Sequence, residues 1–333
     1  MSIGTIKIGD IAIDSPVVLA PMSGVTDKPF RQLVKRFGAG LLVSEMIACR
    51  AMIMQTRQSM QKREVSSLED MTSVQIIGNE HDVMAEAAKL NEDLGAKIID
   101  INFGCPVRKV INGYAGSALM RDEYTAKKIL ESVVNAVKIP VTLKMRTGWD
   151  DNNRNAPALA KAAEDIGIKM IVIHGRTRCQ MYKGHADWEF IKQVKDAIKI
   201  PLIVNGDIKT YDDLEKSLAQ SGADGAMVGR GAYGKPWIIN QFIHYMNTGE
   251  KLPDPDLIEQ KNVVLEHYED MLSHYGIEGG VRISRKHIGW YSTGLHGSSE
   301  FRNQVNKQTD PEIVKGLIND FYDRAIDLSL LPC

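Results

Sequence analysis

Ala136-Val-Lys-Ile-Pro-Val-Thr-Leu-Lys144 and Ala197-Ile-Lys-Ile-Pro-Leu-Ile-Val-Asn205 are two copies of one pattern, 61 residues apart. In each copy, a turn around a proline leads into a short apolar run rich in β-branched residues, which is typical of a buried strand. Similar runs recur along the first two thirds of the chain. They lie at Val17–Leu19, Leu41–Val43, Val74–Ile77, Ile98–Ile101, Val141–Leu143, Ile171–Ile173, Leu202–Val204 and Ala226–Val228.

The spacing of these runs decides between two architectures. They follow one another at intervals of about 30 residues, which leaves room for a strand, a helix and two loops. Nearly continuous apolar strands indicate a parallel sheet covered by helices on both faces. Eight such units with internal similarity predict an α/β fold, the closed (β/α)8 TIM barrel. The alternative is an open doubly wound sheet, but its usual G-x-G-x-x-G turn is replaced here by Ala20-Pro-Met-Ser-Gly24.

The two ends of the chain depart from this repeat. Residues 1–14 alternate apolar and polar side chains around a Gly-Asp turn, which predicts a β-hairpin that plugs the barrel. After a linker rich in Pro, the segments 257–275 and 311–328 have helical periodicity. We therefore predict a barrel domain over residues 1–245 and a small all-helical domain over residues 250–333.

Composition excludes several classes of protein. The 333 residues include 41 Lys and Arg against 42 Asp and Glu, and 44% are hydrophobic, as in soluble globular proteins. No apolar run approaches the roughly 18 residues of a membrane span, and the N-terminus lacks a signal peptide pattern, so we expect no membrane association. The four cysteines show neither C-x-x-C pairs nor zinc spacing. We therefore expect no metal site and a cytoplasmic location.

Polar or reactive side chains follow almost every predicted strand. They are Met22, Glu45, Gln75, Asn102, Cys105, Lys144, His174, Asn205, Asp207 and Arg230. Each residue alone is explained by solvation or by a local partner. However, the carboxyl ends of barrel strands meet at one face, where barrel enzymes carry their active sites. The set therefore predicts an active site at this face.

The last two strand ends indicate the class of ligand. Asn205-Gly-Asp-Ile-Lys209 and Gly229-Arg-Gly-Ala-Tyr-Gly234 follow the seventh and eighth predicted strands. Glycines allow backbone N–H groups to approach an anion closely, and barrels often bind phosphate at these two loops. Arg230 adds a bidentate phosphate donor. We therefore expect a ligand with a phosphate group.

Cys105 lies in the run Ile99-Asp-Ile-Asn-Phe-Gly-Cys-Pro106, directly after a predicted strand. A free cysteine in a cytosolic protein is usually a small buried hydrophobe, but a Gly-Pro turn at a strand end argues for exposure into the site. Gly113 and Gly116 make the following loop a candidate lid. The thiol is then a candidate nucleophile, proton donor or redox sensor. A nucleophile needs a thiolate-stabilising group nearby, and the sequence does not show whether His174 is close.

With these motifs the chain resembles the bacterial tRNA-dihydrouridine synthase family, and within it the B-type subgroup, over essentially its whole length. The matching stretches are Leu19–Asp27, Ser44–Met46, Val74–Gly78, Asp100–Pro106, Lys144–Gly148, His174–Arg178, Asn205–Ile208, Val228–Gly231 and Arg285–Tyr291. The resemblance implies bound FMN, with NADPH as electron donor and NADH as the alternative. It implies reduction of the C5–C6 double bond of D-loop uridines in tRNA, with position 17 favoured and positions 16 and 20 open.

The resemblance also implies a role for each site residue. The flavin ring and ribityl chain would contact Pro21, Met22, Gln75, Lys144 and His174. The ribityl and phosphate site would comprise Asn205, Gly206, Asp207, Gly229 and Arg230. The tRNA substrate would contact Asn102, Arg176, Arg178, Arg285 and Lys286. Cys105 would be the catalytic acid.

These roles agree with elementary chemistry. Reduction of the pyrimidine needs a hydride at C6, which reduced FMN supplies, and a proton at C5. A thiol with an ordinary pKa of about 8.5 is mostly protonated at neutral pH, so Cys105 can donate that proton. Lys144 beneath the flavin would stabilise the anionic reduced ring. For Trp290 and Tyr291 we expect a place in the core of the helical domain.

Two other functions remain open from the sequence. One is a flavin-dependent reductase or dehydrogenase of a free pyrimidine, although a free base needs no basic helical region such as residues 279–307. The other is a non-enzymatic, flavin-containing RNA-binding regulator, although Cys105, Lys144 and His174 are all present. We infer no obligate protein partner and expect a monomer.

Overall fold

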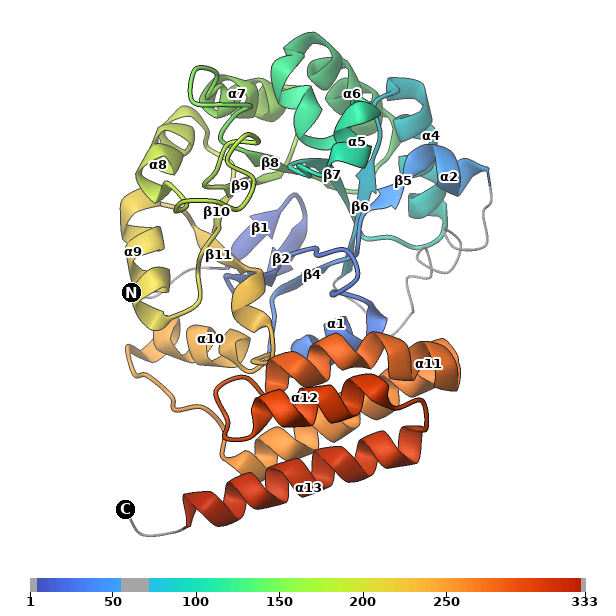
Figure 1. Ribbon diagram of the computed structural model, residues 1–333. Coiled ribbons are helices and arrows are strands. Elements are labelled where there is room, and N and C mark those ends of the chain that lie inside the picture. The colour runs from blue at the N-terminus through green and yellow to red at the C-terminus, as the bar shows by residue number, and fades with distance from the viewer. Residues whose placement is uncertain (1–4, 55–71, 331–333) are drawn as a thin grey trace.

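Parallel strands form a closed ring in the computed structural model, which describes residues 5–54 and 72–330 (Figure 1). The strand order is β4-β3-β11-β10-β9-β8-β7-β6, and β4 also pairs with β6, which closes the ring. The strands are β3 (Val17–Leu19), β4 (Leu41–Val43), β6 (Thr72–Ile77), β7 (Ile98–Phe103), β8 (Val141–Arg146), β9 (Met170–His174), β10 (Leu202–Asn205) and β11 (Gly225–Val228). The predicted TIM barrel is confirmed, and the open-sheet alternative is wrong.

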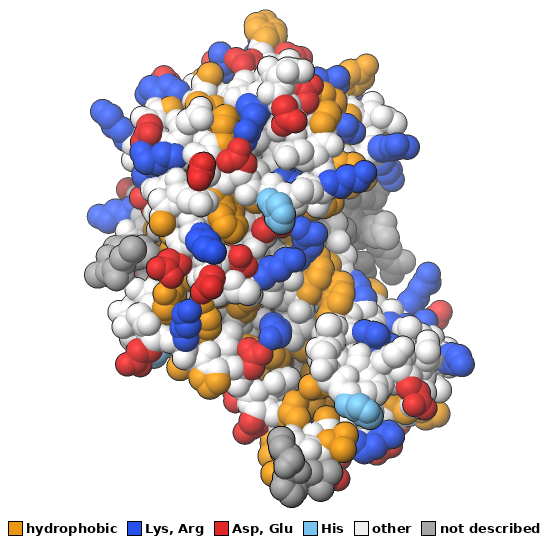
Figure 2. Space-filling model, turned by 60° about the vertical axis from the view of Figure 1, so that its left-hand side comes forward, with side chains coloured by type: hydrophobic (Ala, Val, Ile, Leu, Met, Phe, Trp, Pro, Cys, Tyr) orange, Lys and Arg blue, Asp and Glu red, His pale blue; other side chains and the backbone are white. Residues whose placement is uncertain are grey.

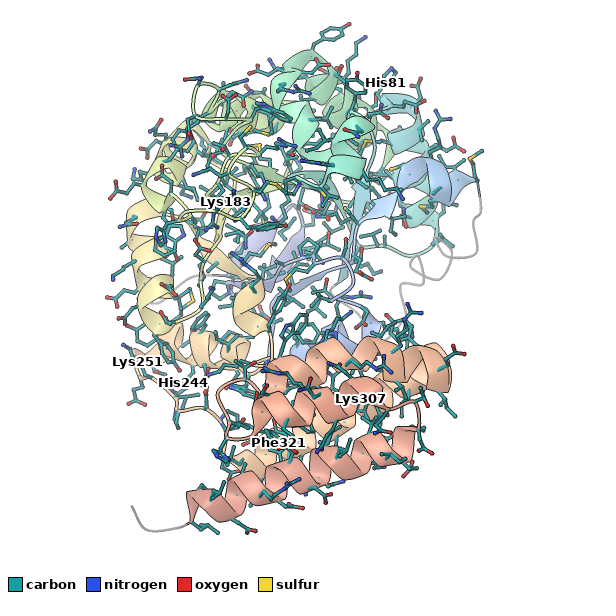
Figure 3. All side chains as sticks on the ribbon, viewed as in Figure 1. His81, Lys183, His244, Lys251, Lys307 and Phe321 are labelled. Carbon is teal, nitrogen blue, oxygen red and sulfur yellow. The ribbon has the colours of Figure 1, made fainter. Side chains whose placement is uncertain are left out.

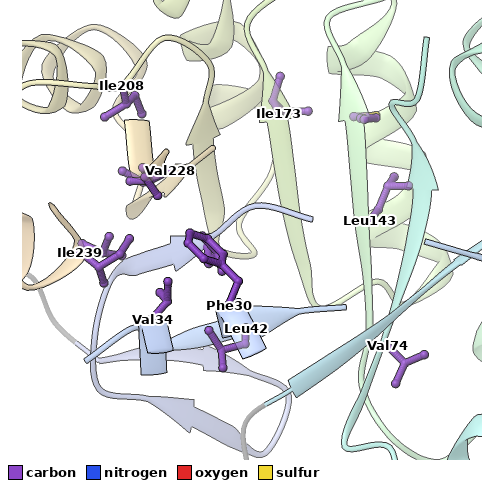
Figure 4. Close-up of a cluster of buried hydrophobic side chains, with 14 of the residues drawn as sticks. Phe30, Val34, Leu42, Val74, Leu143, Ile173, Ile208, Val228 and Ile239 are labelled. Atoms are coloured by element: carbon purple, nitrogen blue, oxygen red, sulfur yellow. The ribbon is translucent and has the colours of Figure 1, made fainter. Parts of the chain in front are cut away.

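An outer layer of helices covers the strands. It comprises α1 (Lys28–Arg36), α2 (Cys49–Ile53), α4 (His81–Asp93), α6 (Glu123–Ala136), α7 (Ala156–Ile166), α8 (Trp188–Ala197), α9 (Tyr211–Ser221) and α10 (Ile238–Thr248). The main hydrophobic core lies between helices and strands: Phe30 and Val34 of α1 and Ile239 of α10 belong to the same cluster as Leu42 and Val228 (Figure 4). This layer therefore fixes the barrel from outside.

The barrel interior has a second, smaller core. Because side chains alternate along a strand, Val17 and Leu19 face the helices while Val18 faces the interior. A hairpin of β1 (Ile6–Ile8) and β2 (Ile11–Ile13) contributes its isoleucines to this inner cluster and lies across the middle of the ring in Figure 1. The hairpin thus fills one end of the barrel and leaves the other end for a ligand.

The second strand is interrupted where it reaches the open end. Val43 of β4 pairs with Ser73, but the next pair is Ile47 of β5 (Ile47–Ala48) with Ile76 of β6. Four steps along one strand therefore match three along its neighbour, which is a β-bulge. The Ser44 hydroxyl accepts a hydrogen bond from the Gln75 N–H at 3.0 Å and replaces a ladder bond. The carboxylate of Glu45, in the bulge, accepts a hydrogen bond from the Gly24 N–H in the loop after β3.

A C-terminal bundle of helices packs against one side of the barrel, next to α1 and α10 (Figure 1). It consists of α11 (Leu257–Tyr291), α12 (Ser298–Lys307) and α13 (Pro311–Ser329). α11 is broken at Gly276, where φ is 74°. Phe30 of α1 contacts the rings of His267 and His287 at 5.5 and 5.6 Å between centroids, so α11 is docked onto the barrel.

Parts of both predicted domains lie outside the described residues, namely 1–4, 55–71 and 331–333. The division at residues 245–250 therefore stays a prediction. Over residues 5–54 and 72–330, no helix combines the length and the apolar composition needed to cross a membrane. Acidic and basic side chains are mixed over the face drawn in Figure 2, in keeping with the formal net charge of −1.

Candidate active site

A cavity of about 490 Å³ opens at the carboxyl ends of the barrel strands. Many of the residues predicted from strand ends line it. They are Pro21, Met22, Gln75, Asn102, Cys105, Lys144, His174, Asn205, Gly206, Asp207, Gly229 and Arg230. The reason is the strand alternation: Leu143 and Met145 face the helices, so Lys144 between them points inward. The structure brings these residues together, while their roles stay predictions.

The strand register makes neighbours of the key polar residues. Asn102 on β7 is paired with Lys144 on β8, and Asn205 on β10 is paired with His174 on β9. The Nζ atom of Lys144 donates a hydrogen bond to Oδ1 of Asn205 at 3.2 Å, across the barrel floor. Burial, followed by the positive charge of Arg146, lowers the pKa of Lys144 to about 8. The floor therefore holds a cation that is poorly compensated, which suits an anionic ligand.

A chain of buried hydrogen bonds fixes the turn before Cys105. Gln75 donates to Oδ2 of Asp100 at 2.6 Å, and Asn102 donates to Oε1 of Gln75 at 2.7 Å. Oδ1 of Asn102 then accepts from the backbone N–H groups of Gly104 and Cys105, both at 2.9 Å. Both ends of the Asn102 amide are therefore used within the protein, and its main effect is to set the position of Cys105.

Cys105 is half-buried at the cavity wall, before α5 (Arg108–Asn112) and η1 (Gly116–Arg121). Its carbonyl accepts from the Ser117 hydroxyl at 2.8 Å. Gly116 has φ +60°, and a Cβ there would lie 2.9 Å from the same carbonyl, so this close contact requires glycine. Burial raises the pKa of the Cys105 thiol, although Arg146 and Lys144 act in the opposite direction. The thiol is therefore protonated at neutral pH and suits proton donation better than nucleophilic attack.

Arg146 is a residue of this site that was not predicted. It is the last residue of β8, 2% exposed, and it lines the cavity. Its Nε donates to the Gly104 carbonyl at 2.8 Å, and its Nη1 donates to the carbonyls of Thr177 and Met181 at 2.9 and 2.8 Å. Arg146 thus ties the Cys105 turn to the loop after β9. The sequence did contain a signal for this position. Arg146 lies two residues after Lys144 on the same strand, so both side chains point to the same face.

His174 is neutral in this environment. Burial, followed by the nearby charges of Arg146 and Lys144, lowers the pKa of His174 well below its usual value. Gly206, with φ +113°, lies against the imidazole, and a Cβ at this position would be 2.6 Å from Cδ2 of His174. The ring is therefore held as a neutral hydrogen-bonding group beside the loop after β10.

The loops after β10 and β11 form the predicted phosphate end. Asp207, with φ +57°, accepts hydrogen bonds from Nη2 of Arg176 at 2.5 Å, from the Ala186 N–H at 2.9 Å and from Nη2 of Arg230 at 3.2 Å. Burial opposes ionisation of Asp207, but these hydrogen bonds outweigh it and lower its pKa. Arg230, in η2 (Arg230–Ala232), stays exposed, and Lys209 also lines the cavity. Two cations therefore remain available to an anion there.

Arg176 lies behind the cavity wall, next to Asp207. It is 1% exposed and does not line the cavity. Besides Asp207, it donates to the carbonyls of Lys183 and Gly184 at 3.1 and 2.7 Å. Figure 3 shows Lys183 in the loop after β9, over the barrel mouth. Every guanidinium nitrogen of Arg176 has a partner inside the protein, and its contact with tRNA stays a prediction.

The other predicted tRNA contacts lie outside the cavity. The guanidinium carbon of Arg178 lies over the Trp149 ring, 4.7 Å from the ring centre. Arg285 donates to the Gln308 carbonyl at 2.7 Å and joins α11 to the end of α12. Lys286 donates to the Gly24 carbonyl in the loop after β3. Arg285 and Lys286 thus hold the helical bundle in place, and their contact with tRNA stays a prediction.

Aromatic side chains shape the cavity mouth and were also missed. Tyr182 is 53% exposed, and its ring centre lies 5.6 and 5.3 Å from the guanidinium carbons of Arg146 and Arg230. Tyr233 lines the cavity, and its ring stacks on that of Trp290 with 4.1 Å between the ring centres. We expected Trp290 in the core of the bundle, but it also contacts the barrel through Tyr233. A lone tyrosine in a loop carries no sequence signal that would have identified either role.

Comparison with known proteins gives a consistent result. The family model of "Dihydrouridine synthase (Dus)" matches residues 18–326. A "Probable tRNA-dihydrouridine synthase" of Rickettsia bellii is 61% identical over 97% of this chain and 99% of its own length. A "tRNA-dihydrouridine synthase B" of Xanthomonas axonopodis is 48% identical over 96% of each chain. An old yellow enzyme homologue from Zymomonas mobilis has the same fold, with a TM-score of 0.53 and 14% identity over 78% of this chain and 95% of its own.

Proposed function

Because this chain belongs to the dihydrouridine synthase family, we propose that it reduces the C5–C6 double bond of D-loop uridines in tRNA to 5,6-dihydrouridine. The observation that carries the proposal is the position of a protonated thiol, Cys105, in the same cavity as the buried cation of Lys144. This combination supplies a proton at one wall and stabilises negative charge at the floor. Relatives with similar sequences are named for this activity.

The residues present fit FMN as the cofactor. A cavity of about 490 Å³ lies within the range of cofactor sites, roughly 300–1,000 Å³. Lys144 would lie beneath the flavin ring, where a positive charge favours the reduced, anionic form. Arg230 and Lys209 at the opposite end are available for the phosphate, next to the glycine cradle of Gly206. Bound FMN would supply a hydride to C6 of the uracil ring, with NADPH as its source of electrons.

The chain's own residues would then orient the substrate and deliver the proton. Arg146 and Asn102 hold the Cys105 turn rigidly, so that the thiol faces the cavity. Cys105 donates its proton to C5 as the hydride reaches C6. The thiolate that forms is stabilised by Arg146 and Lys144, whose charges already act on Cys105. His174, being neutral, would donate or accept a hydrogen bond without adding charge.

A uridine inside folded RNA must leave its stack to enter this cavity. Loops of RNA allow this at lower cost than a duplex does, which suits a target in the D-loop, with position 17 favoured. The helical bundle beside the mouth would hold the rest of the tRNA. As a tRNA-modifying enzyme, the protein would act in the cytoplasm, and we infer no obligate protein partner.

The direct test incubates the purified protein with NADPH and tRNA that lacks dihydrouridine, then digests the tRNA and measures dihydrouridine by mass spectrometry. We expect dihydrouridine at one D-loop position. Parallel reactions contain uracil or orotate in place of tRNA. Reduction of these free pyrimidines without any product in tRNA would replace the proposal with a free-pyrimidine reductase. tRNA binding without turnover of any substrate would indicate a non-enzymatic regulator.

A further inference from the structure

The helical bundle contacts two loops that line the active-site cavity. The Nζ atom of Lys286 donates a hydrogen bond to the carbonyl of Gly24, in the loop after β3. The ring of Trp290 stacks on that of Tyr233, from the loop after β11, with 14° between the two planes. Both residues belong to α11 and are four positions apart, so they lie on the same face of the helix. One helix face of the bundle therefore touches both loops.

These two loops are neighbours around the barrel and form one wall of the cavity. Their strands, β3 and β11, are paired in the sheet. Residues 20–23 of the first loop line the cavity, and so do residues 229–231 and Tyr233 of the second. A Cβ at Gly229 would lie 3.6 Å from Sδ of Met22, so the two loops pack against each other. The predicted FMN contacts Met22 and Gly229 therefore lie in this wall.

Charged side chains hold Gly24 from both sides. Its N–H donates to the carboxylate of Glu45, in the bulge after β4, and its carbonyl accepts from Lys286. The turn around it is tight, because the N–H groups of residues 25–26 both donate to the Met22 carbonyl, at 2.9 and 3.0 Å. A displacement of Gly24 therefore moves Met22 in the cavity wall.

A second contact fixes the position of α11 on this loop. The Tyr275 hydroxyl donates to Oδ2 of Asp27 at 2.9 Å, where the loop ends. Asp27 is 3% exposed, and its Oδ1 caps α1 by accepting from the Phe30 N–H at 3.0 Å. Tyr275 precedes the break at Gly276, and Lys286 follows it. Both parts of α11 therefore hold the same loop.

The loop after β11 approaches α11 equally closely. Gly234 has φ +67°, and a Cβ there would lie 2.4 Å from the carbonyl oxygen of Trp290, so this contact requires glycine. On its other side, the Trp290 ring meets that of buried His287 edge to face, with 5.1 Å between the ring centres. Trp290 thus joins Tyr233 in the cavity wall to the core of the interface between bundle and barrel.

The ammonium group of Lys286 lies among partners within the protein. The side chain is half-buried. Burial lowers the pKa of Lys286, but the charges of Asp27 and Glu45 oppose this effect. Together with the Gly24 carbonyl, these groups satisfy the cation without any ligand. Its surroundings therefore suit a structural role at the cavity wall.

We propose that Lys286 and Trp290 are positioning residues for FMN, because they hold the two loops of this wall at the spacing that the cofactor needs. These roles rest on the proposed function, since they take FMN as the occupant of the cavity. The bundle then completes the cofactor site in addition to holding tRNA. Because coupling between two sites is reciprocal, bound FMN should in turn stabilise α11.

Equilibrium dialysis of the apoprotein with FMN tests these roles without tRNA and without turnover. Lys286→Met removes the donor, and Trp290→Ala removes the stacked ring. We expect each to raise the Kd for FMN about threefold to tenfold, the effect of one lost contact. Lys286→Arg keeps a donor for the Gly24 carbonyl and should recover most of the affinity. Lys261→Met is the matched control on the same helix, since Lys261 pairs with Asp323 within the bundle, and it should keep the parental Kd.

Hydrogen exchange of the unsubstituted protein provides a second test that does not depend on the folding of any variant. FMN should slow exchange of the backbone N–H groups of residues 22–26 and, through Lys286 and Trp290, those of residues 281–291. The helix α13 is the internal reference, because it lies on the side of the bundle away from the barrel (Figure 1). Its exchange should change little when FMN binds.

Parental Kd values for FMN in both Lys286→Met and Trp290→Ala would overturn the proposal, and so would unchanged exchange of residues 281–291. A raised Kd for tRNA together with parental affinity for FMN would also overturn it, and would assign the two residues to tRNA binding alone. Failure of the proposed function looks different, because the unsubstituted protein would then bind FMN as expected here but leave the uridines of tRNA unreduced.

Discussion

Arg146 donates a hydrogen bond from Nε to the carbonyl of Gly104 at 2.8 Å, and this bond joins the end of β8 to the turn that carries Cys105. The same guanidinium reaches the loop after β9 through Thr177 and Met181. One buried side chain therefore sets the distance between the thiol and the opposite wall of the cavity. The arrangement makes Arg146 a positioning residue for the proton donor.

Replacing Arg146 tests this role. Arg146→Lys keeps a positive charge but cannot reach all three carbonyls, so the Cys105 turn loses its anchor. We expect single-turnover uridine reduction to slow by about tenfold to a hundredfold, with FMN still bound. Arg154→Lys is the matched control, since Arg154 pairs with Asp187 outside the cavity. A parental rate for Arg146→Lys would remove the positioning role.

Arg230 should control retention of the cofactor. Its guanidinium is exposed at the proposed phosphate end and has Asp207 as its ion-pair partner there. Arg230→Ala removes a charge-assisted bond to phosphate, so we expect FMN affinity to fall at least about tenfold. Equilibrium dialysis of the apoprotein with FMN measures the change. Lys235→Ala, which removes a neighbouring cation paired with Asp254, should bind FMN like the parent; an equal loss in both would make the effect nonspecific.

Lys144 predicts a pH dependence of FMN binding. Burial lowers the pKa of Lys144 to about 8 in the ligand-free protein, so the ammonium is lost as pH rises through that value. The neutral amine cannot attract the anionic reduced ring, and the affinity for reduced FMN should weaken between about pH 7 and 9. Titration of apoprotein with reduced FMN, in the absence of oxygen, across this range measures the effect. In Lys144→Met the step near pH 8 should vanish, and a step that persists would assign it to another group.

A pair of buried histidines predicts acid sensitivity of the bundle interface. The ring centres of His267 and His287 lie 4.8 Å apart behind Phe30. Among the described residues, Nε2 of each ring has no hydrogen-bond partner. Burial lowers the pKa of His267 to about 3, and burial followed by the charge of His267 lowers that of His287 well below its usual value. The unfolded chain, with ordinary pKa values of about 6.5, therefore binds more protons as pH falls.

The stability contributed by these neutral histidines is present above about pH 6.5 and is lost as pH falls toward 3. At pH 5 the loss should be about 2 kcal/mol for His267, and His287 changes stability in the same direction. Urea unfolding at pH 7 and pH 5 measures it. His267→Phe removes one titrating group, so its stability should fall less between these two values than that of the parent. An identical pH dependence in both proteins would show that His267 does not carry the effect.

Much of the barrel was predictable because its signals are local. Buried parallel strands need continuous apolar runs, and each run, such as Val141–Leu143, falls inside an observed strand. The ring of polar strand ends was predictable for the same reason. Once Leu143 faces the helices, Lys144 must face the interior. Fold and cavity thus follow from periodicity and from the rule that strand ends share one face.

The destinations of the arginines were not predictable, because they depend on distant partners. Arg176 and Arg178 are two residues apart and look equivalent in the sequence. Arg176 forms an ion pair with Asp207, from the loop after the next strand, behind the cavity wall. Arg178 instead lies over the Trp149 ring at the barrel rim. Lys286 likewise meets Gly24, 262 residues away in the chain. Such contacts depend on the assembled loops and leave no periodic trace.

The central claim is that Cys105 protonates a uridine whose reduction is driven by a flavin in this cavity. The most direct measurement follows flavin absorbance without oxygen, first on adding NADPH and then on adding tRNA lacking dihydrouridine. We expect the protein to bleach with NADPH and to recover its colour when the tRNA arrives. Cys105→Ala should bleach equally but recover at least about a hundredfold more slowly. Equal recovery in both proteins, or no recovery in either, would contradict the account.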